Sequence, residues 1–293
     1  MTEGLLSEQF LQQLDRLRMA TKRPVRGMLR GLHRSSRRGS GMEFADFRAY
    51  EQGDDLKNVD WRTFMRLDRL VVKLFVEEAD LPVYLFVDAS ASMGFGTPSA
   101  FDHARKLTAA LAHIALTNMD RVSLVALSDA GMKALPGLRG VGQTWPAFDF
   151  LGRLEAGGGP AMARGFKQFF AAPRPSGLAI VVSDFLDPEG FQTGLDLLRS
   201  RRHEVVILHV GVAVDSMAAL EGEQVLVDSE SGEELTVRIT PATLADYRKE
   251  CERYALALES YCRKHRWSYV ATDTSASVES LVLQSLRSQA LIR

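Results

Sequence analysis

Three oxygen-bearing side chains lie close together in the segment Asp88-Ala89-Ser90-Ala91-Ser92. They follow the apolar run Pro82-Val83-Tyr84-Leu85-Phe86-Val87, which is typical of a strand buried on both faces. One carboxylate and two hydroxyls in a tight loop are hard oxygen ligands, the kind that Mg²⁺ and similar divalent ions prefer. The D-x-S-x-S spacing therefore predicts a metal site at the end of this strand.

A second carboxylate, Asp184, follows another apolar run, residues 178–183. If both runs are parallel strands of one sheet, their ends meet at the same edge, and Asp184 is expected to join the site through water. Mg²⁺ keeps several water ligands, so an acidic side chain of a partner protein could take an open position. The predicted chemistry is metal-assisted binding.

Other uses of this loop stay open. Asp88 could cap the following helix, and Ser90 and Ser92 could satisfy loop amides. A phosphatase with an Asp88 nucleophile would need a second Asp two residues later, where Ser90 stands. No G-x-S-x-G turn occurs, and the six His residues form no ligand motif. We therefore expect no enzymatic activity, with a cryptic hydrolase or phosphatase as the alternative.

A basic tract extends from Arg16 to Arg38, with nine Lys or Arg residues and no acid. Clustered cations can neutralise nucleic-acid phosphates, but the tract lacks interleaved aromatic residues and any recognised motif. The favoured interpretation is a basic face for an acidic patch of a partner protein, and nucleic-acid binding is the alternative. The residues of the expected patch are Arg30, Arg34, Arg37 and Arg38.

Apolar runs and amphipathic segments alternate after Leu81, which predicts an α/β fold with a doubly wound, mostly parallel sheet. Its binding crevice is expected past the ends of the strands that lead to Val87 and Ser183. The expected strands are 70–76, 82–87, 121–127, 178–183, 204–212 and 267–272, with a hairpin at 224–239. The expected helices are 7–19, 99–118, 145–154, 161–170, 191–200, 241–265 and 277–292.

The bulk composition indicates an ordinary globular protein of 293 residues with a net charge of -1. Its two cysteines, Cys251 and Cys262, fall in one expected helix about 16 Å apart, too far for a disulfide. Residues 1–9 lack the basic start of a signal peptide, and no apolar stretch has the roughly 20 residues of a membrane span. A cytoplasmic location is expected.

The order of these features resembles the metal-ion-dependent adhesion site of von Willebrand factor A domains. Here the D-x-S-x-S motif after an apolar strand is followed by a helix, by Asp120-Arg121-Val122 and by a strand that ends in Ser183-Asp184. The preceding segment is similar to the signature of domain-of-unknown-function family 58, and the resemblance covers about residues 25 to 275. The matching stretches are Arg48-Ala49-Tyr50-Glu51-Gln52-Gly53-Asp54-Asp55, Val59-Asp60-Trp61 and Lys73-Leu74-Phe75-Val76-Glu77-Glu78.

This resemblance implies a von Willebrand factor A-like, or Rossmann-like, domain over residues 80–293 with a β-hairpin insertion at 222–240. Residues 1–79 would form an N-terminal segment with a helix, a basic loop and the family's signature strands. Within the Asp54, Asp55, Asp60 and Trp61 cluster we expect a folding motif, in which Asp residues cap, Gly53 takes a tight turn and Trp61 packs, with a docking surface as the alternative.

The resemblance also implies an adaptor or co-chaperone that works with a MoxR-type AAA+ ATPase, or with a client that presents an acidic side chain. Asp88, Ser90 and Ser92 would hold Mg²⁺, or Mn²⁺ or Ca²⁺, and Asp184 would bind it through water. The partner would contact the same loop and also Met93, Gly158 and Gly159. Such sites usually take another hydroxyl from a Thr in a G-G-T loop, but here Pro160 is expected in that place, which predicts either weaker metal affinity or a vestigial site.

Overall fold

The computed structural model describes residues 5–21, 42–77, 81–129, 131–159, 162–187, 190–212, 222–229 and 232–293. The polypeptide forms two compact units. Residues 1–22 and 81–293 make the first, here called the α/β unit, and residues 23–80 make the second, the small unit.

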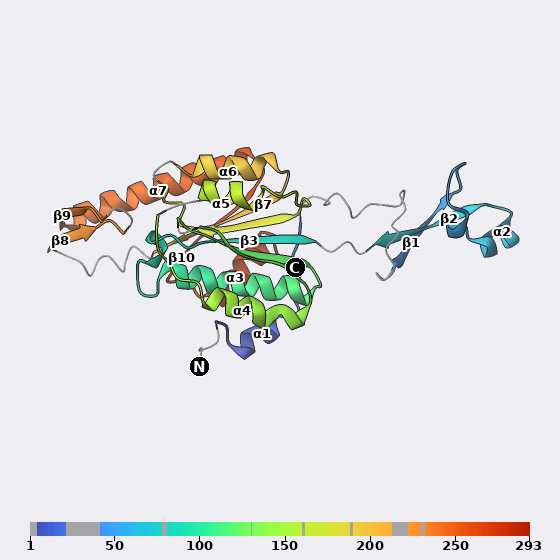
Figure 1. Ribbon diagram of the computed structural model, residues 1–293, viewed down its shortest axis with the longest axis horizontal. Coiled ribbons are helices and arrows are strands. Elements are labelled where there is room, and N and C mark those ends of the chain that lie inside the picture. The colour runs from blue at the N-terminus through green and yellow to red at the C-terminus, as the bar shows by residue number, and fades with distance from the viewer. Residues whose placement is uncertain are drawn as a thin grey trace. The chain divides into compact units, whose positions relative to one another are not determined.

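A six-stranded sheet is the centre of the α/β unit, with strand order β10-β7-β6-β3-β4-β5 (Figure 1). Every neighbouring pair is parallel except β4 and β5, so the predicted doubly wound, mostly parallel fold is confirmed. The strands are β3 (Pro82–Asp88), β4 (Arg121–Leu127), β5 (Lys133–Leu138), β6 (Leu178–Ser183), β7 (Glu204–Gly211) and β10 (Ser268–Asp273).

Helices cover both faces of this sheet. In Figure 1, α3 and α4 lie on one side and α5, α6 and α7 on the other. Their bounds are α3 (Ala100–Thr117), α4 (Thr144–Gly152), α5 (Met162–Phe169), α6 (Phe191–Ser200) and α7 (Pro241–Lys264). The polypeptide passes from β3 to β4 and β5 and then returns to β6 on the other side of β3. The strand order therefore reverses between β3 and β6, which is where a binding crevice is expected.

The two strands at this reversal are held by aromatic packing. All six residues of β6 are buried, as are the last six of β3. Phe86 meets Phe166 and Phe169 of α5 edge to face, with ring centroids 4.9 and 5.2 Å apart. A buried Phe contributes about 1.5–3 kcal/mol, so this cluster fixes the strand ends on which the candidate site depends.

Helix α1 (Glu8–Leu14) begins at Ser7, whose hydroxyl accepts a hydrogen bond from the amide of Phe10, as predicted. Asp15, just after it, lies 2.8 Å from Nε2 of His113 on α3. Further along, Arg18 and Arg293 exchange backbone hydrogen bonds of 2.8 and 2.9 Å. Residues 5–21 thus belong to the α/β unit, whereas the sequence grouped them with residues 1–79. The sequence does not reveal the observed grouping, because these contacts are long-range and leave no local pattern.

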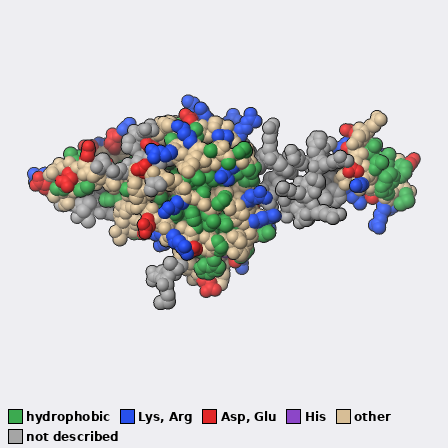
Figure 2. Space-filling model, viewed as in Figure 1, with side chains coloured by type: hydrophobic (Ala, Val, Ile, Leu, Met, Phe, Trp, Pro, Cys, Tyr) green, Lys and Arg blue, Asp and Glu red, His purple; other side chains and the backbone are tan. Residues whose placement is uncertain are grey.

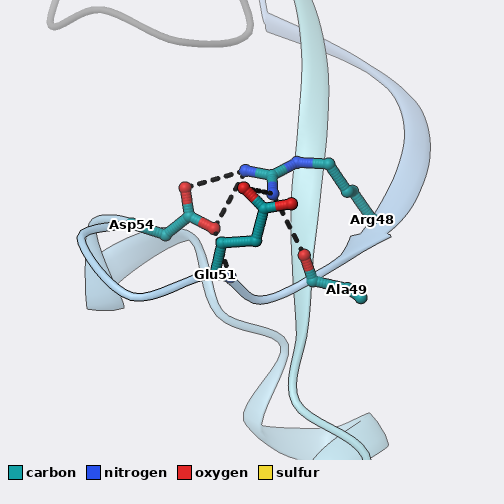
Figure 3. A network of polar contacts seen from close by, with 4 residues as sticks. All are labelled: Arg48, Ala49, Glu51 and Asp54. Carbon is teal, nitrogen blue, oxygen red and sulfur yellow. Dashed lines mark hydrogen bonds and ion pairs between the residues drawn. The ribbon is translucent and has the colours of Figure 1, made fainter.

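The small unit is built on the antiparallel pair β1 (Met42–Ala49) and β2 (Val71–Glu77), with α2 (Trp61–Leu67) between them in the sequence. The Arg48 guanidinium binds both carboxylate oxygens of Asp54, at 2.7 and 2.9 Å, and lies 3.4 Å from Glu51 (Figure 3). Gly53 between them has a φ of +111°, which favours glycine. This part of the signature is a folding motif, as predicted.

Trp61 differs from that expectation. Asp55 and Asp60 do cap the 3₁₀ turn Leu56–Asn58 and α2, respectively. The Trp61 side chain, however, is 50% exposed and contacts Phe64 edge to face. The predicted packing of Trp61 is therefore limited to a partly exposed contact, and α2 has no buried residue.

Other elements agree with or refine the predictions. The hairpin β8 (Gly222–Val227) and β9 (Glu234–Ile239) is present, and both cysteines are free. The expected last helix is shorter: α8 (Val278–Ser280) is followed by a π-helix, Leu281–Leu286. Strands β1 and β5 were not predicted. None of the described helices is both long and apolar enough to cross a membrane.

Candidate functional site

Asp88 and Ser183 join the ends of the adjacent parallel strands β3 and β6. The Ser183 hydroxyl donates a 2.5 Å hydrogen bond to Oδ2 of Asp88, and the amide of Ser90 donates to Oδ1 at 3.0 Å. Asp88 is 7% exposed and Ser183 is fully buried. The Asp88 carboxylate is therefore fixed at the ends of the two strands and keeps unused acceptor capacity, because each oxygen can accept two bonds.

The remaining predicted ligands continue from Asp88 as a series of polar contacts. Ser90 hydrogen-bonds Asp88 through its side chain, and its Oγ lies 3.1 Å from Oγ of Ser92. Ser92 in turn hydrogen-bonds the side chain of Asp184. The structure thus brings together all four residues predicted as metal ligands, with Ser92 the most exposed of them.

The two carboxylates oppose each other's ionisation. Burial raises the pKa of Asp88, and the charge of nearby Asp187 acts in the same direction. Burial and, after it, the Asp88 charge raise the pKa of Asp184 to about 6, against hydrogen bonds from Leu186 and Ser92 that lower it. No described Lys, Arg or His forms an ion pair with either carboxylate. Buried like charges of this kind take up a proton or a cation.

The donor set fits an oxygen-seeking cation with few protein ligands. The ends of β3 and β6 and the loops after them supply two carboxylates and two hydroxyls. Among the described residues, no three His, Cys, Asp or Glu side chains lie together so that they could hold a metal ion. Water would have to complete the shell, which suits Mg²⁺ better than an ion that needs many carboxylates.

A glycine loop packs against the D-x-S-x-S loop through backbone hydrogen bonds. The amide of Gly157 donates to the carbonyl of Ala89 at 2.9 Å, and the amide of Ala91 donates to the carbonyl of Gly158 at 2.8 Å. Gly159 lies beside Asp129, whose amide donates to its carbonyl at 3.1 Å. Gly158 and Gly159 therefore border the site as predicted, whereas Pro160, expected in place of the usual Thr, lies outside the described residues.

Met93 does not fit its predicted role as a partner contact. It belongs to the 3₁₀ turn Ser92–Gly94, which directs its side chain into the core, and it is 0% exposed. Instead, each loop carries an exposed large apolar side chain, Phe95 in the first and Leu186 in the second. These two residues were missed because nothing in their local pattern distinguishes them from core positions.

The helix-capping alternative for Asp88 is wrong. Ser99 caps α3, and its hydroxyl accepts a 3.1 Å hydrogen bond from the amide of Asp102. The loop-amide alternative assigned that role to the hydroxyls of Ser90 and Ser92, whereas it is the Asp88 carboxylate that accepts a hydrogen bond from a loop amide, that of Ser90. That bond engages only one acceptor position of the carboxylate.

Residues behind the site hold the Asp184 loop. Tyr254 of α7 donates a 2.5 Å hydrogen bond to the carbonyl of Phe185. His209 of β7 bonds the backbone of Asp184, and its Nδ1 lies 2.8 Å from the hydroxyl of Tyr269. Burial lowers the pKa of His209 to about 4, so the ring is neutral at pH 7. The sequence did not identify Tyr254, His209 or Tyr269 as supports of the site. Ser183 could have been identified, because it directly precedes Asp184 at the end of a strand.

The predicted basic patch of Arg30, Arg34, Arg37 and Arg38 lies outside the described residues. Of the basic tract, only Arg16 and Arg18 fall among the described residues, in the segment that follows α1. Both nucleic-acid binding and pairing with an acidic partner therefore stay predictions.

Comparison with known proteins gives relatives along most of the sequence. "Uncharacterized protein Mb1516" of Mycobacterium bovis and "Uncharacterized protein Rv1480" of Mycobacterium tuberculosis are each 29% identical over 243 residues, 80% of this chain and 76% of theirs. Among solved structures, the SpRpn10 VWA domain aligns with a TM-score of 0.33 and 17% identity, over 57% of this chain and 93% of that one. The family model "Protein of unknown function DUF58" matches residues 46–255. This match spans more than half of the sequence, and the chain therefore belongs to the DUF58 family.

Proposed function

We propose that the α/β unit is a non-enzymatic protein-binding module whose contact with its partner is completed by a divalent cation. One observation carries this proposal. Two buried carboxylates from adjacent strand ends, Asp88 and Asp184, are linked by the hydroxyls of Ser90 and Ser92 at the point where the strand order reverses.

Asp88, Ser90 and Ser92 would hold the ion, and Asp184 would reach it through water. When bound, Mg²⁺ would neutralise the two negative charges and offer a position to an Asp or Glu of the partner. The exposed side chains of Phe95 and Leu186 would supply apolar contact around that polar centre. The proposed partner, which the family resemblance implies, is a MoxR-type AAA+ ATPase or a client that it remodels.

The arrangement around Asp88 supports binding over hydrolysis. A nucleophilic carboxylate needs access to substrate and a nearby acid-base group. Asp88 is buried, its oxygens accept bonds from Ser183 and the Ser90 amide, and the residue two positions later is Ser90. An assay panel of phosphomonoester and carboxyl-ester substrates tests this point, and turnover lost in Asp88→Asn would contradict it.

Isothermal titration tests the metal. Mg²⁺ and Mn²⁺ are titrated into the wild type, into Asp88→Ala and into Asp149→Ala, a matched change of an exposed Asp on α4. Saturable heat from the wild type and Asp149→Ala, but not from Asp88→Ala, is expected. Flat traces from all three would end the metal proposal, and retention of a co-expressed MoxR-type ATPase in EDTA would separate partner binding from the cation.

A further inference from the structure

The exposed face of α2 in the small unit carries large apolar side chains beside arginines. Met65 is 77% exposed, Leu67 65% and Trp61 50%. Figure 2 shows hydrophobic side chains gathered at the surface of this unit, at the right of the view, next to basic ones. Apolar side chains grouped in this way on a surface mark an interaction site more often than single exposed ones do.

These side chains form two parallel rows along α2. Trp61 and Met65 are four residues apart, as are Arg62 and Arg66, and residues with this spacing are neighbours on one helix face. All four side chains are exposed. We call this set, Trp61, Arg62, Met65 and Arg66, the α2 surface.

The arginines of α2 have no acidic partner among the described residues. Arg62 and Arg66 form no ion pair there, and neither does Arg69 just after the helix. By contrast, Arg153, Arg253 and Arg263 of the α/β unit each pair with an acid three or four residues earlier. The α2 surface therefore presents unbalanced positive charge beside apolar area. A ligand with the opposite charge and its own apolar stripe would satisfy both.

The α2 surface is also held in place before any partner arrives. Asp60 caps α2 by accepting hydrogen bonds from the amide of Arg62 at 3.2 Å and the hydroxyl of Thr63 at 3.1 Å. Lys73 of β2 lies 3.7 Å from the same carboxylate, and the amide of Asp60 donates to the carbonyl of Val71 at 2.9 Å. Since the helix is already ordered, binding would cost little conformational entropy.

The geometry points to a second interaction site: the α2 surface docks an acidic, amphipathic helical segment of a partner protein. The apolar stripe of that helix packs on Trp61 and Met65, and its Asp or Glu residues pair with Arg62 and Arg66. Exposed acids on the same unit, Glu51, Asp55 and Asp68, would be repelled by an anionic membrane. These acids favour a discrete protein ligand whose acidic residues contact only Arg62 and Arg66.

A titration of the full-length protein with designed peptides tests this docking site. The probe is a helical peptide with one leucine stripe flanked by Glu, compared with the same peptide carrying Lys for Glu and with a scrambled sequence. Indole N–H signals in NMR spectra report the contact, with Trp145 of α4, also exposed, as an internal control. The Trp61 signal is expected to shift with the acidic peptide alone, while that of Trp145 stays unchanged.

Two variants distinguish specific docking from general attraction. The pair Arg62→Glu and Arg66→Glu should weaken peptide binding by about tenfold or more, whereas Arg153→Glu, a change of an exposed Arg just after α4, should leave it unchanged. Equal binding of the scrambled peptide, or unaffected binding by the Arg62→Glu/Arg66→Glu protein, would overturn the inference. Binding of phosphatidylserine vesicles in place of the peptide, or concentration-dependent dimerisation through Trp61, would overturn it too and assign the surface to a membrane or to a second copy instead.

Discussion

The Ser183 hydroxyl lies 2.5 Å from the Asp88 carboxylate and joins two strands through residues that are 95 positions apart in the sequence. The same hydroxyl accepts a 2.8 Å hydrogen bond from the amide of Phe185, so it also shapes the loop that carries Asp184. One buried side chain thus positions both carboxylates of the candidate site.

Replacing Ser183 by Ala should destabilise the protein by about 1.5–3 kcal/mol, because a buried carboxylate loses a hydrogen-bond donor. Urea unfolding in EDTA measures this. Ser200→Ala is the control, since the Ser200 hydroxyl bonds a carbonyl at an exposed position and should cost below about 0.5 kcal/mol. Equal stability of Ser183→Ala and the wild type would mean that the bond contributes nothing.

Asp184→Asn should make the metal-free protein more stable at neutral pH. The folded-state pKa of Asp184 is raised to about 6 from its ordinary value of 3.8, so above pH 6 the native state holds this buried carboxyl in its ionised form, which lowers the free energy of unfolding by roughly 3 kcal/mol. That cost falls as the pH drops through 6 and is gone below the unfolded pKa. The gain from Asn should therefore appear at pH 7.5 and shrink towards pH 4.

Thermal and urea unfolding in EDTA at several pH values check this expectation, with Asp149→Asn as the surface control. The Asn side chain can still accept the 3.0 Å hydrogen bond from the amide of Leu186, so the loop should keep its form. A less stable Asp184→Asn protein at pH 7.5 would contradict the prediction, because it would show that native contacts of the ionised carboxylate outweigh the cost of its burial. Added Mg²⁺ should raise the stability of the wild type and of Asp149→Asn, but not that of Asp184→Asn.

His203 should weaken the fold in mild acid. Burial lowers its pKa to about 4, with the Arg201 charge acting in the same direction, and its Nδ1 accepts a 3.2 Å hydrogen bond from the amide of Gly177. Between the ordinary pKa of 6.5 and pH 4 the unfolded state binds a proton that the native state excludes. Stability should fall through this window, by about 3 kcal/mol at its lower end.

A His203→Gln variant isolates this contribution, because Gln is uncharged and can accept the same hydrogen bond. The difference in unfolding free energy between the wild type and His203→Gln is measured at pH 7, 6 and 5. As the pH falls, the wild type should lose stability relative to the variant. A constant difference would show that His203 has the same pKa in the native and the unfolded state, and would contradict the expectation.

Gly177→Ala should be severely destabilising. A Cβ at Gly177 would lie 2.1 Å from the carbonyl oxygen of Pro82, so β6 and β3 would have to move apart. The expected loss exceeds about 3 kcal/mol. Gly152→Ala is the matched control, because a Cβ there meets no atom within 4 Å. It should be neutral or stabilising by up to about 1 kcal/mol, and equal effects of the two changes would contradict the clash.

Much of the fold follows from local patterns. Strands β3, β4 and β6 are buried on both faces, and α3 and α7 have clear caps, so these elements lie within two residues of their expected bounds. Strand β5 was missed because it lies at the sheet edge, is half-exposed, and contains Pro136 and Gly137, which disfavour strands. The π-helix likewise has no pattern that separates it from an α-helix.

The sequence predicted the position of the candidate site but not all the residues that form and support it. Two strand ends followed by Asp88 and Asp184 identify a sheet edge, because parallel strands end together. The inward turn of Met93 and the support from Tyr254 and His209 depend on packing between distant segments. Such contacts carry no spacing rule, and only the three-dimensional arrangement shows them.

The pairing of residues 18–20 with residues 291–293 has a consequence for how the protein is made. During synthesis on a ribosome, Arg18 leaves the exit tunnel early, whereas Arg293 follows the entire small unit and every strand of the central sheet. The small unit can be complete while the larger one still waits for its final pairing. In newly made polypeptides, the backbone of residues 18–20 would therefore lack these partners until residues 291–293 have left the ribosome.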